Sequence, residues 1–257
     1  MRIGFLSIIT MTILSGFILQ ENRQTKVIAH RGAWKNTNVP ENSIAALQHA
    51  IAMNCYGSEF DVHMSADSIP FVLHDHSIQG IAIEQTPAAE LSKIKLSNGE
   101  PLPTLESYLL AGKNQTQTRL ILEIKSSRVS PERSLALAKK CVELVSKTGM
   151  ATMTDYIAFS FDVCREVKKL APQAHVQYLN GDKTPEQVAA AGINGLDYHY
   201  SIFQKNEHWL VDAHRYKLVT NAWTVNDEPS LLWLIDRKID MITTNEPERL
   251  LEILKQR

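Results

Sequence analysis

The sequence lacks a surplus of charge of either sign. Its 257 residues include 27 Lys and Arg against 28 Asp and Glu, which gives a formal net charge of −1 at pH 7. A protein that binds a nucleic-acid backbone does so through a broad basic surface that releases counterions, and this composition does not supply one. We therefore expect no nucleic-acid partner, and any phosphate chemistry must depend on a local cluster of charges.

Cysteine is scarce as well. Only Cys55, Cys141 and Cys164 occur, and none of the short spacings typical of zinc sites separates them. We expect all three to be buried apolar side chains, although one disulfide is possible.

No Gly-rich, Ser-rich or low-complexity linker divides the chain. With 44% hydrophobic residues, a chain of this length can bury a sizeable core, either as one barrel or as two small domains. Because no boundary is visible, we expect a single domain over residues 26–257.

The N-terminus differs from the rest of the chain. Arg2 precedes an apolar stretch over residues 3–19, and residues 20–23 are polar. This pattern predicts that residues 1–25 are a signal peptide or an N-terminal membrane anchor. Cleavage is favoured because the run is short for a spanning helix of about 20 residues. The alternative is an apolar helix packed on the domain.

This segment has no clear small-x-small cleavage site, and no cysteine follows it, so a lipid anchor at cysteine is not supported. We expect an exported protein, periplasmic or secreted. Contact with a membrane could be made through this segment.

Short β-type runs alternate with helical patterns from residue 26 onward. Eight strands, each followed by a helix, favour a closed parallel barrel over an open sheet. We therefore expect an α/β fold, a (β/α)₈ TIM barrel. The strands are predicted at residues 27–29, 57–62, 120–124, 156–160, 176–179, 195–198, 218–223 and 240–243. The helices are predicted at residues 43–54, 104–111, 131–147, 162–170, 185–191, 207–216, 229–236 and 247–254, several of them with Pro in the first turn.

One further β-type run, residues 71–73, does not fit the alternation. It follows the second strand by only about ten residues, fewer than a parallel crossover needs, so it should return antiparallel as a hairpin that extends that strand. A hairpin would bring His74 back to the level of Asp61. Both residues should then lie at the C-terminal rim of the barrel, where barrel active sites are built.

Acidic side chains occur at the ends of the second and third strands. Glu59 and Asp61 are two residues apart, as are Glu123 and Lys125, so each pair points to one face. Three carboxylates that face one another would repel strongly, and a bound divalent cation removes this repulsion. Their all-oxygen donor set predicts one Mg²⁺ or Ca²⁺ ion rather than zinc.

Histidine and cationic side chains accompany the carboxylates. His30 and His74 could provide the general acid and general base of phosphodiester cleavage, because imidazole titrates near neutral pH. Arg31 and Lys125 offer positive charge to the phosphoryl oxygens. His63 could join the metal ligands or orient one of them.

With these motifs the sequence resembles the glycerophosphodiester phosphodiesterase family. The resemblance covers nearly everything after Lys26. It runs through His30-Arg31-Gly32, Pro40-Glu41-Asn42-Ser43, Glu59-x-Asp61-Val62, Val72-Leu73-His74-Asp75, Leu102-Pro103-Thr104-Leu105-Glu106, Glu123-Ile124-Lys125, Ser160-Phe161-Asp162 and Trp223-Thr224-Val225-Asn226.

The resemblance implies a phosphodiesterase barrel that cleaves small glycerophosphodiesters to glycerol 3-phosphate and an alcohol such as choline or ethanolamine. In this family a glycerol hydroxyl attacks the phosphorus, and water then opens the resulting cyclic phosphate. The implied site consists of three metal ligands, an acid–base pair and two phosphate ligands: Glu59, Asp61 and Glu123; His30 and His74; Arg31 and Lys125.

Two aromatic residues, Phe161 and Trp223, look like the apolar wall beside the glycerol in the family. Packing in the top of the barrel is an equal alternative for both. Glu41 precedes a helix N-cap; it could contact the site, but we expect capping or ordering of the loop to be its role.

The chain departs from the family after His74-Asp75, where many members continue with an Arg-Thr-Thr run and this chain has residues 76–80 of different sequence. The hairpin tip, usually Lys-Asp-Gly, is Ala66-Asp67-Ser68 here. The stretch from Gly80 to Pro103 leaves little room for the small inserted domain that some relatives carry. These differences concern the head group of the substrate.

Two alternative functions stay open. One is a related barrel phosphodiesterase that acts on a lysophospholipid, sphingolipid or phosphoinositide. The other is a catalytically silent protein that binds phospholipid head groups, which the intact set of histidines and carboxylates disfavours. The oligomeric state is not indicated by the sequence.

Overall fold

A computed structural model describes residues 24–257 of the chain. The predicted signal peptide or anchor, except for its last two residues, lies outside the described residues, and export stays a prediction. Among residues 24–257 no helix is both long and apolar enough to span a bilayer.

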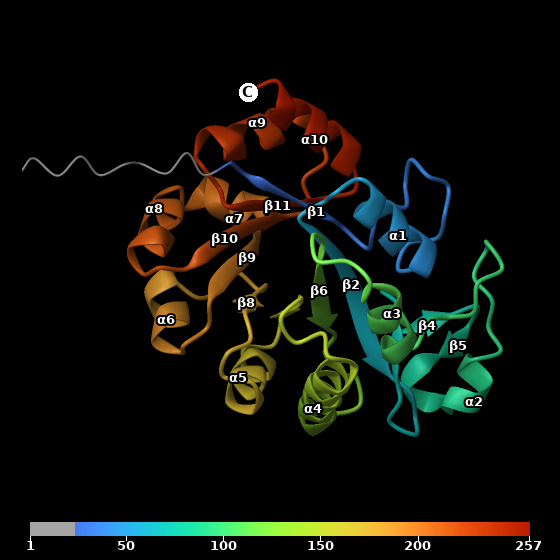
Figure 1. Cartoon of the computed structure of the whole chain (residues 1–257). Helices are drawn as coiled ribbons and strands as arrows, with labels where there is room; N and C mark the ends of the chain where they lie inside the picture. Colours follow the sequence, from blue (N-terminus) through green and yellow to red (C-terminus); the bar gives the residue numbers. More distant parts are fainter. Residues whose placement is uncertain (1–23) are drawn as a thin grey trace, which may run out of the picture.

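Eight parallel strands close into a barrel (Figure 1). Each strand pairs with the next along the chain, and the last pairs with the first, so that Ile28 lies beside Thr243 on one side and Gly57 on the other. This confirms the predicted TIM barrel. The strands are β1 (Lys26–Ala29), β2 (Gly57–Met64), β6 (Arg119–Ile124), β7 (Thr154–Ala158), β8 (Val176–Tyr178), β9 (Gly195–His199), β10 (Val219–Trp223) and β11 (Met241–Thr244).

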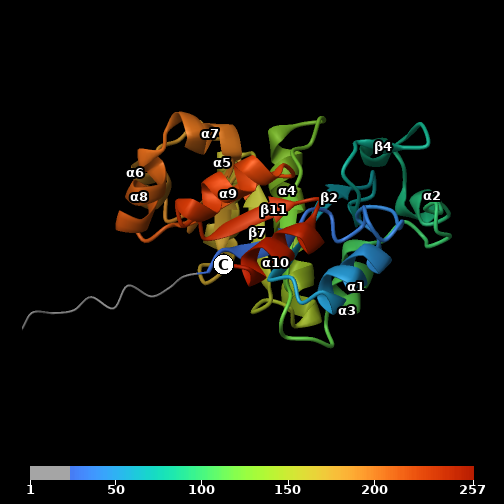
Figure 2. The same ribbon diagram turned by 90° about the horizontal axis from the view of Figure 1, so that it is seen from above.

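Helices surround the barrel and connect its strands (Figure 1, Figure 2). They are α1 (Ile44–Ala52), α3 (Leu105–Ala111), α4 (Pro131–Thr148), α5 (Phe161–Leu170), α6 (Pro185–Ala190), α7 (Tyr200–Lys205), α8 (His208–Arg215), α9 (Glu228–Asp236) and α10 (Pro247–Lys255). Side chains that accept a backbone hydrogen bond begin many of them: Ser43, Thr104, Ser130, Ser160, Thr184 and Asp227. Helix α7 was not predicted.

The predicted hairpin is present. Strand β3 (Pro70–Val72) pairs antiparallel with the end of β2, so that Val72 lies beside Val62 and Phe71 beside His63. The backbone N–H of Leu73 then donates to the carbonyl of Asp61 at 3.0 Å. The chain therefore returns to the mouth of the barrel directly before His74.

The segment that follows the hairpin, residues 77–91, forms a small excursion from the barrel. This excursion lies at one side of the barrel, away from α6 and α8 (Figure 1, Figure 2). Its core is separate from the main one and includes Phe71, Ile83 and Leu91. The excursion is too small for an inserted domain, as expected, but its antiparallel sheet was not predicted. Its elements are β4 (Ser77–Ile78), β5 (Ile81–Ala82), the 3₁₀ helix η1 (Ile83–Gln85) and α2 (Ala88–Leu91).

Side chains that point into the barrel form levels of four, with alternate strands contributing to each level. An apolar cluster of Ile28, Ile121, Ile157, Leu179 and Met241 occupies much of the interior. The strand register places two mixed levels near the mouth. The lower consists of Glu59, Ile157, Asp197 and Thr243, and the upper of His30, Glu123, Leu179 and Trp223.

The three cysteines are free and buried, at distinct places in the main core. This confirms that they serve as apolar side chains, and no disulfide forms between them.

Candidate active site

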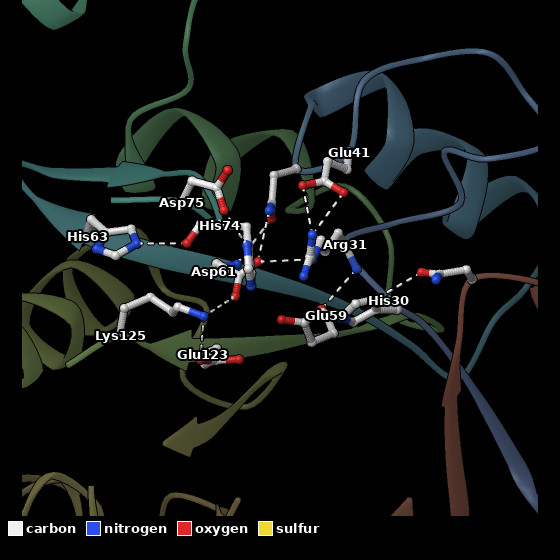
Figure 3. Close-up of polar contacts among 12 residues, drawn as sticks. His30, Arg31, Glu41, Glu59, Asp61, His63, His74, Asp75, Glu123 and Lys125 are labelled. Atoms are coloured by element: carbon white, nitrogen blue, oxygen red, sulfur yellow. Dashed lines mark hydrogen bonds and ion pairs between the residues drawn. The ribbon is translucent and has the colours of Figure 1, made fainter. Parts of the chain in front are cut away.

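Three carboxylates from two neighbouring strands converge at the mouth of the barrel (Figure 3). Glu59 and Asp61 extend from β2 and Glu123 from β6, where Asp61 and Glu123 are register partners. One carboxylate oxygen from each lies within 4.8 Å of the others, and the residues are only 2%, 1% and 8% exposed. The structure thus brings together the three residues predicted as metal ligands.

The pKa values of Glu59 and Glu123 reflect burial and the repulsion between neighbouring carboxylates. Burial and the negative charges of Asp61 and Glu123 raise the pKa of Glu59 well above its ordinary value. Burial and Asp61 likewise raise the pKa of Glu123 to about 7. Glu59 Oε1 is buried without a hydrogen-bond partner among the described residues. A hard divalent cation would satisfy that oxygen and remove the repulsion, so the donor set fits Mg²⁺ or Ca²⁺.

Two cations flank the carboxylates. Lys125 Nζ lies 3.2 Å from Asp61 Oδ1 and 2.9 Å from Glu123 Oε1, and Arg31 Nε lies 3.6 Å from Asp61 Oδ2. Burial alone would raise the pKa of Asp61. The Coulomb interactions with Lys125, His74 and Arg31, together with a hydrogen bond from the Asn42 amide, outweigh burial and lower this pKa to about 2. The predicted phosphate ligands therefore lie beside the predicted metal ligands.

The loop between β1 and α1 fixes Arg31 at the mouth. Its guanidinium Nη1 donates to both oxygens of Glu41, at 2.8 and 3.0 Å, while its backbone N–H donates to Glu59 Oε2 at 2.8 Å. Glu41 thus orders the loop by binding an arginine of the candidate site, so it combines the two roles considered for it. Gly32 has a φ of +80°, and a Cβ there would lie 2.7 Å from the backbone of Ala46, so glycine lets this loop pack against α1.

Asn42, in the same loop, forms two hydrogen bonds with Asp61. Its Nδ2 donates to Asp61 Oδ2 at 2.9 Å, and its Oδ1 accepts from the Asp61 backbone N–H at 3.1 Å. Its φ of +58° lies in the left-handed region, which asparagine tolerates better than most residues. Sequence reasoning treated this residue only as part of a capping motif, although its presence in a turn was a usable signal.

His30 enters the site from the end of β1. Its Nδ1 donates to Asn245 Oδ1 at 2.7 Å, because an amide oxygen can only accept, and its Nε2 lies 3.9 Å from Glu59 Oε2. Burial and the neighbouring Arg31 lower the pKa of His30 to about 4. Asn245 was not predicted, because it lies more than two hundred residues from its partner.

His74 enters from the hairpin. Its Nδ1 lies 2.8 Å from Asp75 Oδ1, and this hydrogen bond lowers the pKa of Asp75. The carbonyl of His74 accepts a hydrogen bond from His63 Nε2 at 2.9 Å. His63, predicted to join or orient the metal ligands, lies on the β2 arm of the hairpin and fixes the backbone of His74.

A cavity of about 110 Å³ opens beside these groups. Trp223 lines it, but Phe161 does not. The ring of Phe161, at the start of α5, lies 4.9 Å from that of Tyr178. Phe159, two residues beyond the inward-facing Ile157, lines the cavity instead, with its ring 5.5 Å from Trp223.

The complete lining comprises residues from all eight barrel strands or the loops after them, and from the hairpin: His30, Arg31, Glu59, His74, Glu123, Lys125, Ile157, Phe159, Leu179, Asp197, Trp223, Thr224 and Thr243. A larger hollow of about 590 Å³ contains none of these residues and lies at the opposite end of the barrel, beside Tyr56, Arg119 and Asp155.

Comparisons with known proteins identify the family of the chain. The model of the "Glycerophosphoryl diester phosphodiesterase family" matches residues 30–249. A glycerophosphodiester phosphodiesterase of Caldanaerobacter subterraneus subsp. tengcongensis is 27% identical over 248 residues, which cover 91% of this chain and 99% of the relative.

Solved structures are similar as well. A glycerophosphodiester phosphodiesterase from Parabacteroides distasonis is 43% identical, with a TM-score of 0.89 over 91% of this chain and 98% of that one. An Oleispira antarctica phosphodiesterase, solved in complex with its product sn-glycerol-3-phosphate, shares the fold at 24% identity and a TM-score of 0.77, over 90% of this chain and 97% of that one. The chain therefore belongs to the glycerophosphoryl diester phosphodiesterase family and is a phosphoric diester hydrolase.

Proposed function

We propose that this protein hydrolyses glycerophosphodiesters, such as glycerophosphocholine and glycerophosphoethanolamine, to glycerol 3-phosphate and an alcohol. One observation carries the proposal: two histidines with different hydrogen-bond partners enter one small cavity on which a buried carboxylate cluster and two cations converge. The product bound to the Oleispira relative supports the assignment of the substrate class.

Glu59, Asp61 and Glu123 would hold one divalent cation, Mg²⁺ or Ca²⁺. The buried oxygen of Glu59 that has no partner among residues 24–257 supports this assignment. When bound, such an ion polarises the phosphoryl oxygens and offsets the charge that develops on them.

Arg31 and Lys125 hold the phosphate of the substrate. Arg31 is fixed by Glu41 and by its own backbone N–H, so its guanidinium is positioned before substrate arrives. Lys125 lies between two carboxylates that keep its ammonium charged, and it can follow the phosphoryl group as a point charge.

We assign His30 as the general base and His74 as the general acid. Because Asn245 accepts from Nδ1 of His30, the free Nε2 of that ring can take a proton. At His74 the carboxylate of Asp75 attracts a protonated ring, which can therefore carry a proton to the substrate.

The reaction then proceeds in two halves. His30 removes the proton of the glycerol hydroxyl next to the phosphate, and that oxygen bonds to phosphorus. The bond from phosphorus to the alcohol oxygen breaks, and His74 protonates this oxygen. In the second half water opens the cyclic phosphate, with the two histidines in reversed roles.

The first test is product release by the purified protein. We expect glycerol 3-phosphate and choline to form from glycerophosphocholine in the presence of Mg²⁺ or Ca²⁺, and chelation to abolish the reaction. Restoration by added metal is the control for damage by the chelator. Activity that persists after chelation would remove the metal from the proposal, and no release under any condition would contradict the substrate class.

A further inference from the structure

Asp197 on β9 forms part of the floor of the cavity and takes no part in the chemistry described above. It faces Glu59 across the barrel, on the level below His30 and Trp223. The residue is 1% exposed, and its Oδ1 has no hydrogen-bond partner among the described residues. A buried polar atom that lacks a partner costs stability, so its retention at the floor of a binding cavity calls for a ligand.

The surroundings of Asp197 are mixed, because its register partner Asn221 forms a side-chain hydrogen bond with it while other neighbours are apolar. Ile157 and Leu179 line the cavity beside it, and the indole Nε1 of Trp223 donates to the Asp197 carbonyl at 2.9 Å, which fixes the ring over this part of the floor. Burial raises the pKa of the Asp197 carboxyl. Its Oδ1, which has no partner among the described residues, can accept a hydrogen bond from a hydroxyl group.

The position of the phosphate then decides which hydroxyl could reach the floor. Arg31 and Lys125 lie at the mouth, where they would hold the phosphoryl group above the floor. The glycerol carbons would lie against Trp223, and the hydroxyl farthest from phosphorus would extend toward Asp197. The hydroxyl next to the phosphate stays at the level of His30.

We propose that Asp197 recognises the free terminal hydroxyl of the glycerol moiety and so restricts the enzyme to glycerophosphodiesters that carry no acyl chain. This inference rests on the proposed function. In a lysophospholipid the same oxygen is an ester that cannot donate a hydrogen bond, and its acyl chain would have to enter a cavity of about 110 Å³. Asp197 would thus be the specificity residue that separates the two substrate classes.

The experiment uses choline release from three substrates by the purified protein with Mg²⁺ or Ca²⁺. They are glycerophosphocholine, its analogue made from propane-1,2-diol, which lacks only the terminal hydroxyl, and 1-acyl-lysophosphatidylcholine. We expect kcat/KM to be about 10²-fold lower for the analogue than for glycerophosphocholine, because the site is built to bind a hydroxyl. The lysolipid should be a poorer substrate still.

Substitution of Asp197 then tests whether this residue causes the preference for glycerophosphocholine. In Asp197→Leu the preference for glycerophosphocholine over the analogue should fall to within about 3-fold, whereas Asp197→Asn, which keeps a donor and an acceptor, should retain most of it. The matched control is Asp155→Asn, a buried carboxyl at the opposite end of the barrel, which should keep the full preference.

The outcomes separate the two proposals. Equal rates for glycerophosphocholine and its analogue in the unchanged protein would overturn the role of Asp197, even if the Leu variant fails to fold. An Asp197→Leu protein that loses both activities in equal proportion would overturn it as well, because that result indicates a purely structural role. No choline release from glycerophosphocholine by the unchanged protein would contradict the proposed function itself.

Discussion

His30 and His74 have the same side chain but different hydrogen-bond partners. Asn245 accepts from the Nδ1 of His30, and an amide oxygen carries no full charge. Asp75 is a carboxylate that accepts from Nδ1 of His74 and carries a full negative charge. Because the two rings differ in their partners, changing Asn245 or Asp75 tests which ring serves as the base and which as the acid.

The histidine assignment predicts a graded loss of activity. His30→Ala and His74→Ala should each lower kcat by at least about 10²-fold, because proton transfer is lost. Asn245→Ala and Asp75→Ala should lower kcat by about 10-fold, because the rings remain but are no longer oriented. Steady-state kcat values with glycerophosphocholine as substrate measure these losses.

His208→Ala is the matched control for these variants, because its ring is exposed on α8, and its kcat should be normal. A near-normal kcat in His30→Ala would exclude it as the base.

At the level of the element, the hairpin and its excursion position His74. Glu84, in η1, accepts hydrogen bonds from Ser127 Oγ at 2.5 Å and from the Arg128 backbone N–H at 2.9 Å. Its Oε1 also lies 3.4 Å from Arg133 Nε, on α4. One buried carboxylate therefore connects the excursion to the segment that follows β6.

This connection extends back to the backbone of His74. The Ile83 N–H donates to the carbonyl of His76, and the rings of His76 and His63 meet with centroids 4.6 Å apart. His63 in turn holds the carbonyl of His74. Glu84 is thus a positioning residue for His74, although it does not reach the cavity.

We predict that Glu84→Gln lowers kcat by about 10-fold with little change in KM, because the phosphate and glycerol contacts are untouched while His74 is less well placed. Glu90→Gln, on the exposed side of α2, is the control and should leave kcat and KM unchanged. Steady-state kinetics with glycerophosphocholine gives both constants. A variant in which KM rises and kcat is unchanged would show that the excursion contacts substrate instead.

For the whole molecule, a metal ion held by the carboxylate cluster would couple stability to metal binding. Glu59, Asp61 and Glu123 are buried together, and their mutual repulsion opposes folding of the metal-free chain. A ligand that binds only the folded state stabilises it by mass action, by about 2.7 kcal/mol at a concentration 100 times its Kd.

We therefore expect saturating Mg²⁺ or Ca²⁺ to raise the Tm by about 5–10 °C relative to chelator, given the size of the domain. Calorimetry of the purified protein measures the shift. Asp61→Asn should reduce it, whereas Asp155→Asn, which leaves the cluster intact, should not. Identical melting curves with metal and with chelator would contradict a metal site in the folded protein.

The sequence by itself determined the barrel, the hairpin and the three predicted carboxylate ligands. Strand and helix periodicities are local, and residues two apart on a strand face the same side, so the pairing of Glu59 with Asp61 needed no tertiary information. Parity does not separate Phe159 from Phe161, because both follow Ile157 by an even number of residues; Phe159 lines the cavity because β7 ends at Ala158 and α5 begins at Phe161.

The tertiary structure alone decided which distant side chains meet these residues. Asn245 reaches His30 because β11 closes the barrel beside β1, and Asn42 reaches Asp61 because its loop adopts a left-handed turn. Asp197 lies under the cavity because β9 stands opposite β2 in the closed barrel. Such contacts depend on barrel closure and on backbone dihedral angles, neither of which has a local sequence period.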